Sequence, residues 1–133
     1  MERKIAFHLN CLEQGGAERV VSNLANRFAA NGYEVLVATL WQGENEFQLD
    51  ERVRRVHVGL KPGDEKKSRI AQFLLHIHYL KQFLRKEKPD ILIPFARKAL
   101  YRGLTAAFFM KIPVLISIST DPVGHYDMLF DKV

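Results

Sequence analysis

Apolar runs alternate with helix-type segments along this chain, and that alternation most limits its fold. The first run, Lys4–Leu9, is apolar on both faces, and similar runs occur at Tyr33–Leu40, Ile91–Phe95 and Val114–Ile118. Continuous apolar runs of this length are typical of parallel strands that are covered on both sides. A shorter run, Val53–Val58, mixes valines with arginines and predicts a strand near a sheet edge.

Between these strands lie segments whose apolar residues recur at helical spacing. One helix is predicted from about Ala17 to a stop at Asn31-Gly32, a second runs from the N-cap Ser68 to about Lys86, and a third covers Leu100–Met110. The resulting order of elements predicts an α/β fold with a Rossmann-like open, mostly parallel sheet. Right-handed crossovers would place helices on both faces of that sheet.

Length, charge and cysteine content bound the class of protein. The 133 residues suit one domain with one core. Cys11 is the single cysteine, which we interpret as a small buried residue in a protein of a reducing compartment. No apolar stretch reaches the length of a signal peptide core or a membrane span, so we expect a cytoplasmic protein. The net charge of +5 fits phosphates, anionic lipid or nucleic acid without choosing among them.

A Gly-Gly turn joins the first strand to the first helix, in the segment LEQGGAERVV. In open α/β sheets, ligands bind beyond the carboxyl ends of the strands, where such a loop lies. Gly15 and Gly16 would let the backbone approach a ligand, and the helix would direct free N–H groups to the same place. The chain contains neither a G-x-x-x-x-G-K-[ST] nor a G-x-G-x-x-G loop. On the residues alone, a plain turn and a ligand-binding loop both stay open.

The stretch from Lys4 to Leu40 resembles the opening of retaining glycosyltransferases of the GT-B fold, family 4 (group 1). The resemblance rests on the GGAER turn and on the helix and strand RVVSNLANRFAANGYEVLVATL that follow it. KPDILIPF and IPVLISIST also fall where that family has its later N-terminal strands. The resemblance implies that residues 1–133 are the N-terminal, acceptor-side domain of such an enzyme.

The resemblance also implies an activity and its partners. The enzyme would transfer a sugar from a nucleotide-sugar donor to a glycan or lipid-linked acceptor, most commonly in polysaccharide or lipopolysaccharide biosynthesis. The nucleotide-sugar is a substrate, so no cofactor and no metal is implied. In the family, a C-terminal Rossmann-like domain binds most of the donor, and residues 1–133 do not supply it. We therefore expect a fragment of a larger enzyme that is inactive alone, while a separate partner chain or a degenerate gene stays open.

Several substrate-binding residues follow from this resemblance, and no catalytic residue is assigned. At the glycine-rich turn they are Gly15, Gly16, Glu18 and Arg19. After the fifth strand, Ser119 stands where the family usually has a histidine, and Asp121 follows it. This departure puts a histidine-assisted role in doubt unless His125 reaches the site.

A basic cluster follows the fourth strand, in the segment RKALYR. Arg97, with Lys98 and Arg102, would lie at the edge of the sheet where ligands bind. A contact with a phosphate and an ordinary surface role both stay open for this cluster. The arginines of the edge segment RVRR are interpreted as structural, because charge on an edge deters aggregation; they are Arg52, Arg54 and Arg55.

The helix that begins after Ser68 is amphipathic. Its apolar side is formed by Ile70, Phe73, Leu74, Ile77, Leu80 and Leu84, and His78, Lys81 and Arg85 share another face. One interpretation is peripheral contact with the inner face of a membrane that holds a lipid-linked acceptor. The other is a solvated helix face. His76 and His78 are two residues apart, so they make a poor metal-binding pair.

A function of a different class is a non-catalytic α/β module that binds anionic surfaces or nucleic acid. The basic runs lack the interleaved aromatic residues that stacking on bases requires, and no helix-turn-helix signature is visible. We therefore expect no nucleic-acid partner. A response-regulator-like domain would need an acidic cluster after the first strand, where this chain has Asn10 and Cys11.

Overall fold

A computed structural model describes residues 3–12, 16–43, 45–95, 97–108 and 110–115. Its centre is a fully parallel four-stranded sheet with the strand order β3-β2-β1-β4. The strands are β1 (Lys4–Leu9), β2 (Glu34–Thr39), β3 (Arg54–His57) and β4 (Ile91–Pro94). The chain therefore builds outward from β1 to β3 and then returns to place β4 on the other side of β1.

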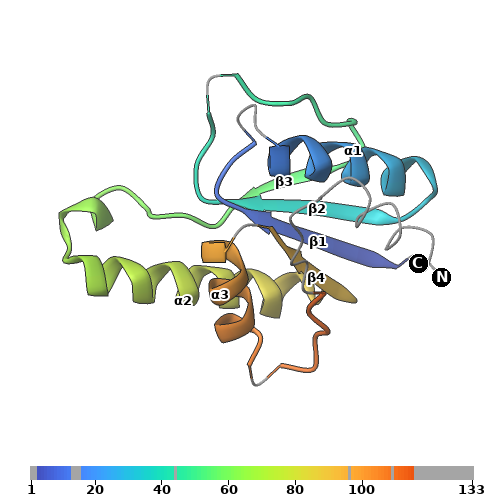
Figure 1. Cartoon of the computed structure of the whole chain (residues 1–133). Helices are drawn as coiled ribbons and strands as arrows, with labels where there is room; N and C mark the ends of the chain where they lie inside the picture. The colour runs from blue at the N-terminus through green and yellow to red at the C-terminus, as the bar shows by residue number, and fades with distance from the viewer. Residues whose placement is uncertain (1–2, 13–15, 44, 96, 109, 116–133) are drawn as a thin grey trace.

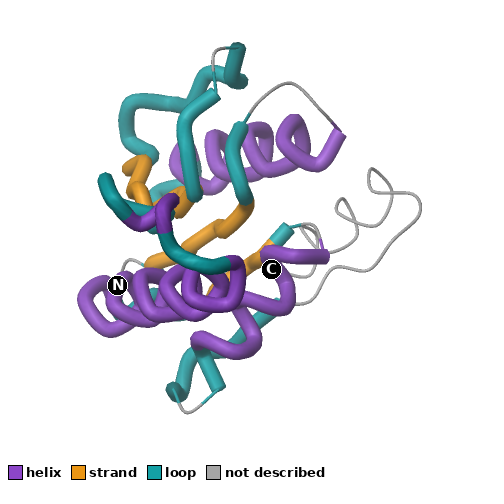
Figure 2. The backbone as a smooth tube through the Cα atoms, turned by 90° about the vertical axis from the view of Figure 1, so that its left-hand side faces the viewer, coloured by secondary structure: helices purple, strands orange, loops and turns teal. Residues whose placement is uncertain are grey.

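Helices cover both faces of the sheet, as predicted (Figure 1). Helix α1 (Gly16–Ala30) lies on one face, whereas α2 (Arg69–Glu87) and α3 (Arg97–Ala106) lie on the other. The view in Figure 2, turned by 90°, shows the strands between these two helical layers. A short 3-10 helix, η1 (Asp64–Lys66), precedes α2.

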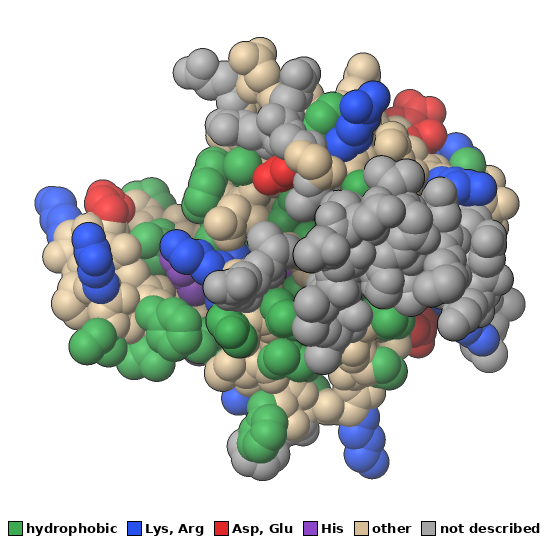
Figure 3. Space-filling view, in the orientation of Figure 1, with side chains coloured by type: hydrophobic (Ala, Val, Ile, Leu, Met, Phe, Trp, Pro, Cys, Tyr) green, Lys and Arg blue, Asp and Glu red, His purple; other side chains and the backbone are tan. Residues whose placement is uncertain are grey.

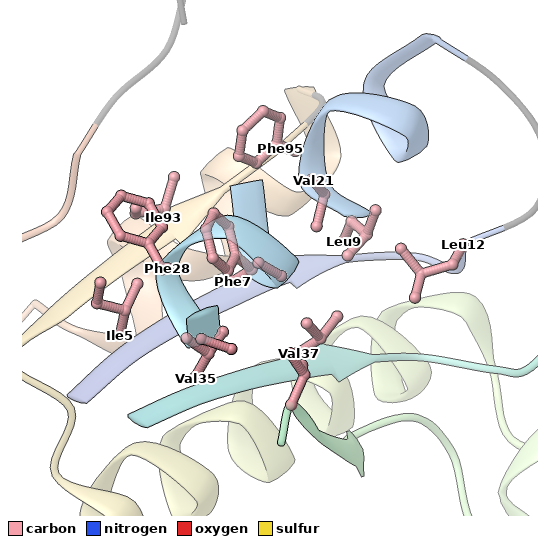
Figure 4. Close-up of a cluster of buried hydrophobic side chains, with 13 residues drawn as sticks. Ile5, Phe7, Leu9, Leu12, Val21, Phe28, Val35, Val37, Ile93 and Phe95 are labelled. Carbon is pink, nitrogen blue, oxygen red and sulfur yellow. The ribbon is translucent and has the colours of Figure 1, made fainter. Parts of the chain in front are cut away.

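The pleat of the strands sorts their side chains between the two layers. Ile5, Phe7 and Leu9 of β1 pack toward α1, where Phe7 lies between Phe28 of the helix and Phe95 (Figure 4). The ring centroids of Phe7 are 6.3 Å from Phe28 and 6.1 Å from Phe95. Full burial of one such side chain contributes about 1.5–3 kcal/mol.

The opposite face of the sheet is lined by smaller residues where α2 and α3 cross it. Ala6 and Leu36 pack against Leu80 and Leu84 of α2. Gly103 brings α3 close to β4, because a Cβ at this position would meet the Leu92 Cδ2 atom at 3.3 Å. The lack of a side chain at Gly103 thus places the middle of α3 directly against the sheet.

Most of the elements expected from the sequence are confirmed. The Ser68 hydroxyl caps α2 by accepting a hydrogen bond from the Ala71 N–H at 3.2 Å, and Gly32 follows α1 with a φ of 91°. Cys11 is buried. Strand β3 occupies an edge of the sheet.

Two boundaries differ from those expected. Helix α3 spans Arg97–Ala106 instead of Leu100–Met110, because the chain tightens after Ala106 into turns such as the Met110 N–H bond to the Ala107 carbonyl at 2.9 Å. In the expected fifth strand, Val114 makes a parallel bridge to Leu92, and residues 116–118 lie outside the described part of the chain.

An ion pair organises the loops at the carboxyl edge of the sheet. Arg55 of β3 donates to Glu46 Oε2 at 2.8 Å and to the Thr39 hydroxyl at 3.0 Å. The Glu46 carboxylate also accepts from the backbone N–H groups of Leu12, at 3.0 Å, and Gly43, at 2.9 Å. These bonds, with Arg55 foremost, lower the pKa of Glu46 to about 2. Arg55 therefore has the predicted structural role, but it acts through a shielded network that joins β3 to the loops after β1 and β2.

We predict that Glu46→Gln lowers the free energy of unfolding by about 1–3 kcal/mol, because it removes a half-buried charge that several donors share. Glu51 is exposed in the turn before β3, so Glu51→Gln is the matched control. Urea unfolding followed by circular dichroism measures both changes. Equal effects in the two variants would contradict the structural role of Glu46.

Candidate functional site

A hollow of about 410 Å³ opens at the carboxyl edge of the sheet, on the side of α2 and α3. The residues after β1 and β2, the first half of α2 and the first turns of α3 line it. In that order they are Asn10, Leu40 and Trp41; Arg69, Gln72, Phe73 and His76; and Lys98, Tyr101 and Arg102. In the space-filling view, hydrophobic side chains gather beside basic and histidine side chains over α2 and its junction with α3 (Figure 3).

The hollow lies where the topology of the sheet predicts a ligand. The chain connects β1 to β2 on one side, and β4 pairs with β1 on the other, so the connections diverge at β1. Open α/β sheets bind ligands in the crevice outside the carboxyl ends of strands at such a point. Asn10, the residue after β1, lines the hollow. The expectation that the loop after the first strand lies at this point is confirmed.

A buried polar chain supports the floor of the hollow. His8 of β1 is completely buried on the α2 and α3 side of the sheet. Its Nδ1 atom is 3.0 Å from the Ala38 carbonyl, and its Nε2 atom is 3.1 Å from Arg102 Nε. A second Arg102 nitrogen donates to the side-chain oxygen of Asn10. Helix α3 is thereby tied to the central strand.

These contacts define the protonation state of His8. A carbonyl only accepts, so the Nδ1 atom carries the proton, and Nε2 must accept because the Arg102 Nε–H points to it. Both ring nitrogens are used by a neutral imidazole. Burial, with the positive charge of Arg102, lowers the pKa of His8 to about 3. His8 is therefore neutral at physiological pH and acts as a hydrogen-bond acceptor for the guanidinium.

The hollow is strongly basic. Arg69, Lys98 and Arg102 line it, and no acidic side chain is among its described lining residues. Burial lowers the pKa of Arg102 to about 10, which still leaves it charged at neutral pH. Burial and the charge of Arg102 also lower the pKa of His76. With Trp41 and Tyr101 beside these cations, the hollow suits an anionic ligand that also carries a flat or apolar part.

Of the two glycines of the glycine-rich turn, only Gly16 is described, and it is not among the described lining residues of the hollow. Gly16 is the first residue of α1 and is exposed, with open space where a Cβ would lie. Glu18 is half-buried and Arg19 is exposed, and neither is among the described lining residues. Gly15 lies outside the described part of the chain. A binding role for this turn stays a prediction.

The other expected site residues have mixed outcomes. Ser119, Asp121 and His125 lie outside the described residues. Arg97 is the first residue of α3, and its backbone alone is described. Arg102 does not have the surface role that the sequence left open, because it is only 5% exposed.

Sequence reasoning missed the partnership of His8 with Arg102. A signal was present, because His8 is a polar residue in an otherwise apolar strand and shares its face with Ala6. The partner is 94 residues away in the sequence, so no local pattern identifies it.

Within the described ranges, no group of three or more His, Cys, Asp or Glu side chains could hold a metal ion. The helices of the described ranges include none with the length and apolar character needed to cross a membrane.

Comparison with known proteins places the fold. The family model of Glycosyltransferase Family 4 matches residues 14–127. A Campylobacter jejuni protein is 28% identical over 114 residues, which are 86% of this chain and 32% of the relative. Its name is GalNAc-alpha-(1->4)-GalNAc-alpha-(1->3)-diNAcBac-PP-undecaprenol alpha-1,4-N-acetyl-D-galactosaminyltransferase. The chain thus spans about a third of the length of this curated relative.

Solved structures share the fold at low sequence identity. The lipopolysaccharide outer core galactosyltransferase WaaB is 17% identical, with a TM-score of 0.63, over 84% of this chain and 32% of that protein. MurG of Acinetobacter baumannii is 13% identical, with a TM-score of 0.62, over 86% of this chain and 34% of that protein. These similarities confirm the expected Rossmann-like half of a GT-B fold.

We predict that acid destabilises this protein partly through His8. The unfolded chain takes up a proton on this residue near pH 6.5, whereas the folded chain does so near pH 3. Stability should therefore fall as the pH drops below about 6.5, by up to about 1.4 kcal/mol per pH unit for one such group. Between pH 7 and pH 5, His8→Gln should lose about 1–2 kcal/mol less than the wild type.

Urea unfolding at the two pH values measures this difference. His57 is exposed, and His57→Gln is the matched control that should retain the wild-type pH dependence. The lowered pKa of His76 affects the pH dependence of stability in the wild type and in both variants, so the comparison isolates the contribution of His8. An unchanged pH dependence in His8→Gln would show that the buried imidazole is not held neutral.

Proposed function

The chain belongs to glycosyltransferase family 4, and from that premise we propose that it forms the acceptor-side domain of a sugar-transferring enzyme. The enzyme moves a sugar from a nucleotide-sugar donor to a glycan or lipid-linked acceptor, in the assembly of a polysaccharide or lipopolysaccharide. The observation that carries this proposal is the basic, aromatic-lined hollow at the carboxyl edge of the sheet. Cations there suit a phosphorylated substrate, and the rings of Trp41 and Tyr101 suit sugar or lipid carbon.

In this proposal, the nucleotide-sugar binds mainly to a second Rossmann-like domain, which residues 1–133 do not include. The curated relative is about three times as long as this chain, which supports a larger enzyme. The acceptor-side domain, residues 1–133, would orient the acceptor and help to stabilise charge on the departing diphosphate. We expect residues 1–133 alone to be inactive in transfer.

Part of α2 is suited to meeting a membrane. Its second half packs on the sheet, but its first half projects beyond the sheet (Figure 1). There Ile70 is 75% exposed and Leu74 is 59% exposed, and the exposed cations Lys66, Lys67 and Arg69 lie next to them in the chain. Apolar side chains bordered by cations bind the interface of an anionic leaflet. The predicted apolar side of α2 is therefore divided between the core and solvent.

We place the protein in the cytoplasm, peripherally at the inner face of a membrane. The name of the Campylobacter jejuni relative includes a PP-undecaprenol-linked glycan, which supports a lipid-linked acceptor for this family member as well. Contact through Ile70 and Leu74 would bring the adjacent hollow to the level of lipid headgroups, because Arg69 and Phe73 line that hollow.

Sugar transfer by the full-length protein that carries this chain tests the proposed function. Purified protein is incubated with a panel of nucleotide-sugars and a polyprenyl-diphosphate-linked glycan, and mass spectrometry detects the extended glycan. Gly16→Val should reduce turnover on the order of 100-fold, since a side chain there would displace a substrate at the turn. The fold should persist, because a Cβ at Gly16 meets no atom within 4 Å.

Asn23 is exposed on the same helix, so Asn23→Val is the matched control and should retain turnover. Wild-type turnover in Gly16→Val would remove the glycine-rich turn from the substrate site. Absence of transfer from every donor and acceptor would count against the enzyme function itself.

For the membrane contact, we predict that Ile70→Asp combined with Leu74→Asp weakens binding to phosphatidylglycerol vesicles at least about tenfold, because two apolar side chains lose their burial. Vesicle co-sedimentation measures this change. Phe108 is 73% exposed near the end of α3, and Phe108→Asp is the control that should bind like the wild type. Equal binding by all three proteins would disprove the α2 contact.

A further inference from the structure

Arg102 is a buried cation whose described hydrogen-bond partners are neutral. It lies in the middle of α3 and is 5% exposed. Its Nε–H donates to His8, and a terminal N–H donates to Asn10. None of the ion pairs among the described residues includes Arg102. A guanidinium has five N–H donors, so these two bonds leave donors for another group.

This arrangement is costly for a residue with only a structural role. Moving a charge out of water requires several kcal/mol, which an opposite charge normally offsets. His8 and Asn10 supply only dipoles, and the buried His8 is held neutral by its contacts with Ala38 and Arg102. The described neighbours of Arg102 thus fix the orientation of the guanidinium without neutralising it.

The charge of Arg102, which none of its described neighbours neutralises, faces a space that a ligand can enter. Arg102 lines the hollow at the carboxyl edge of the sheet together with the exposed Lys98 and Arg69. These three cations come from two helices, and acidic side chains are lacking among the described lining residues. Trp41, 48% exposed, and Phe73, 52% exposed, also line the hollow and offer an apolar surface.

We propose that Arg102 anchors a phosphoryl or diphosphoryl group in this hollow, oriented by His8 and Asn10 and assisted by Lys98 and Arg69. Guanidinium groups bind phosphate oxygens through parallel N–H donors, and a shielded position strengthens these charge-assisted bonds. The ligand would supply the negative charge that Arg102 lacks among its described neighbours. The proposal deepens the proposed function by assigning the phosphorylated part of a substrate to a specific residue.

Two substrates of such an enzyme contain this group: a lipid diphosphate and a nucleotide diphosphate. The shared chemistry is the diphosphate, and the hollow accommodates it from either source. From the hollow, a lipid chain can extend along the neighbouring rings toward α2, whereas a nucleotide base can stack on Trp41.

Binding to the 133-residue chain is measured with inorganic pyrophosphate, geranyl diphosphate and uridine diphosphate as probes. Trp41 is the single tryptophan of the chain and lines the hollow, so its fluorescence reports binding without any assay of transfer. We expect saturable binding of pyrophosphate to the wild type. Arg102→Met should weaken it about 10- to 100-fold, as expected for hydrogen bonds to a charged group.

Lys98→Ala provides a second variant that does not depend on a buried residue. Lys98 is exposed, so its removal should leave the fold intact and weaken binding about three- to tenfold. Lys111→Ala, an exposed cation outside this hollow, is the matched control and should bind like the wild type. Circular dichroism establishes that each variant is folded.

The outcomes distinguish three questions: whether the site binds a diphosphate, whether that diphosphate belongs to a lipid or a nucleotide, and whether the proposed enzyme function holds. Tighter binding of geranyl diphosphate than of pyrophosphate supports the proposal with a lipid source, and tighter binding of uridine diphosphate supports it with a nucleotide source. Absence of binding, or equal binding by wild type, Lys98→Ala and folded Arg102→Met, overturns it. Arg102-dependent binding to the 133-residue chain, combined with no sugar transfer by the full-length protein, would sustain this site and reject the proposed function.

Discussion

The hydrogen bond from Arg102 Nε to His8 Nε2, 3.1 Å long, joins the third helix to the central strand of the sheet. It exists because Gly103 allows α3 to approach β4 and because the pleat of β1 turns His8 toward that helix. The same contact holds the imidazole neutral and aims the guanidinium at the hollow. The approach of α3 to the sheet, the protonation state of His8 and the direction of the Arg102 charge are therefore linked in one buried pair.

The two faces of the sheet have different tasks. The face beneath α1 is filled by Phe7, Phe28 and Phe95 and serves stability. The face beneath α2 and α3 has smaller residues and keeps a buried polar chain near its carboxyl edge. At that edge the Arg55–Glu46 pair holds the loops after β1 and β2 through hydrogen bonds. Asn10 and Trp41, which line the hollow, lie in these loops. The site is thus supported from the strand side as well as from the helices.

Family membership and the local chemistry support the same proposed class of ligand. The name of the Campylobacter jejuni relative includes a PP-undecaprenol-linked glycan, and this chain places three cations around an aromatic-lined hollow at the edge of its sheet. The projecting half of α2 presents Ile70 and Leu74 next to the same hollow. The proposed lipid surface and the proposed phosphate site would therefore be neighbours in this fold, as a membrane-held acceptor would require.

The sequence by itself determined the order of strands and helices, the cap at Ser68, the stop at Gly32 and the family. Each depends on residues that are neighbours in the chain: periodic apolar positions, a short capping contact, a glycine with positive φ and a contiguous motif. The tertiary structure alone decided that Arg102 is buried against His8, because a contact across 94 residues depends on how close α3 packs to β4. It likewise decided which half of α2 stays exposed, since periodicity marks an apolar side but not where the sheet ends.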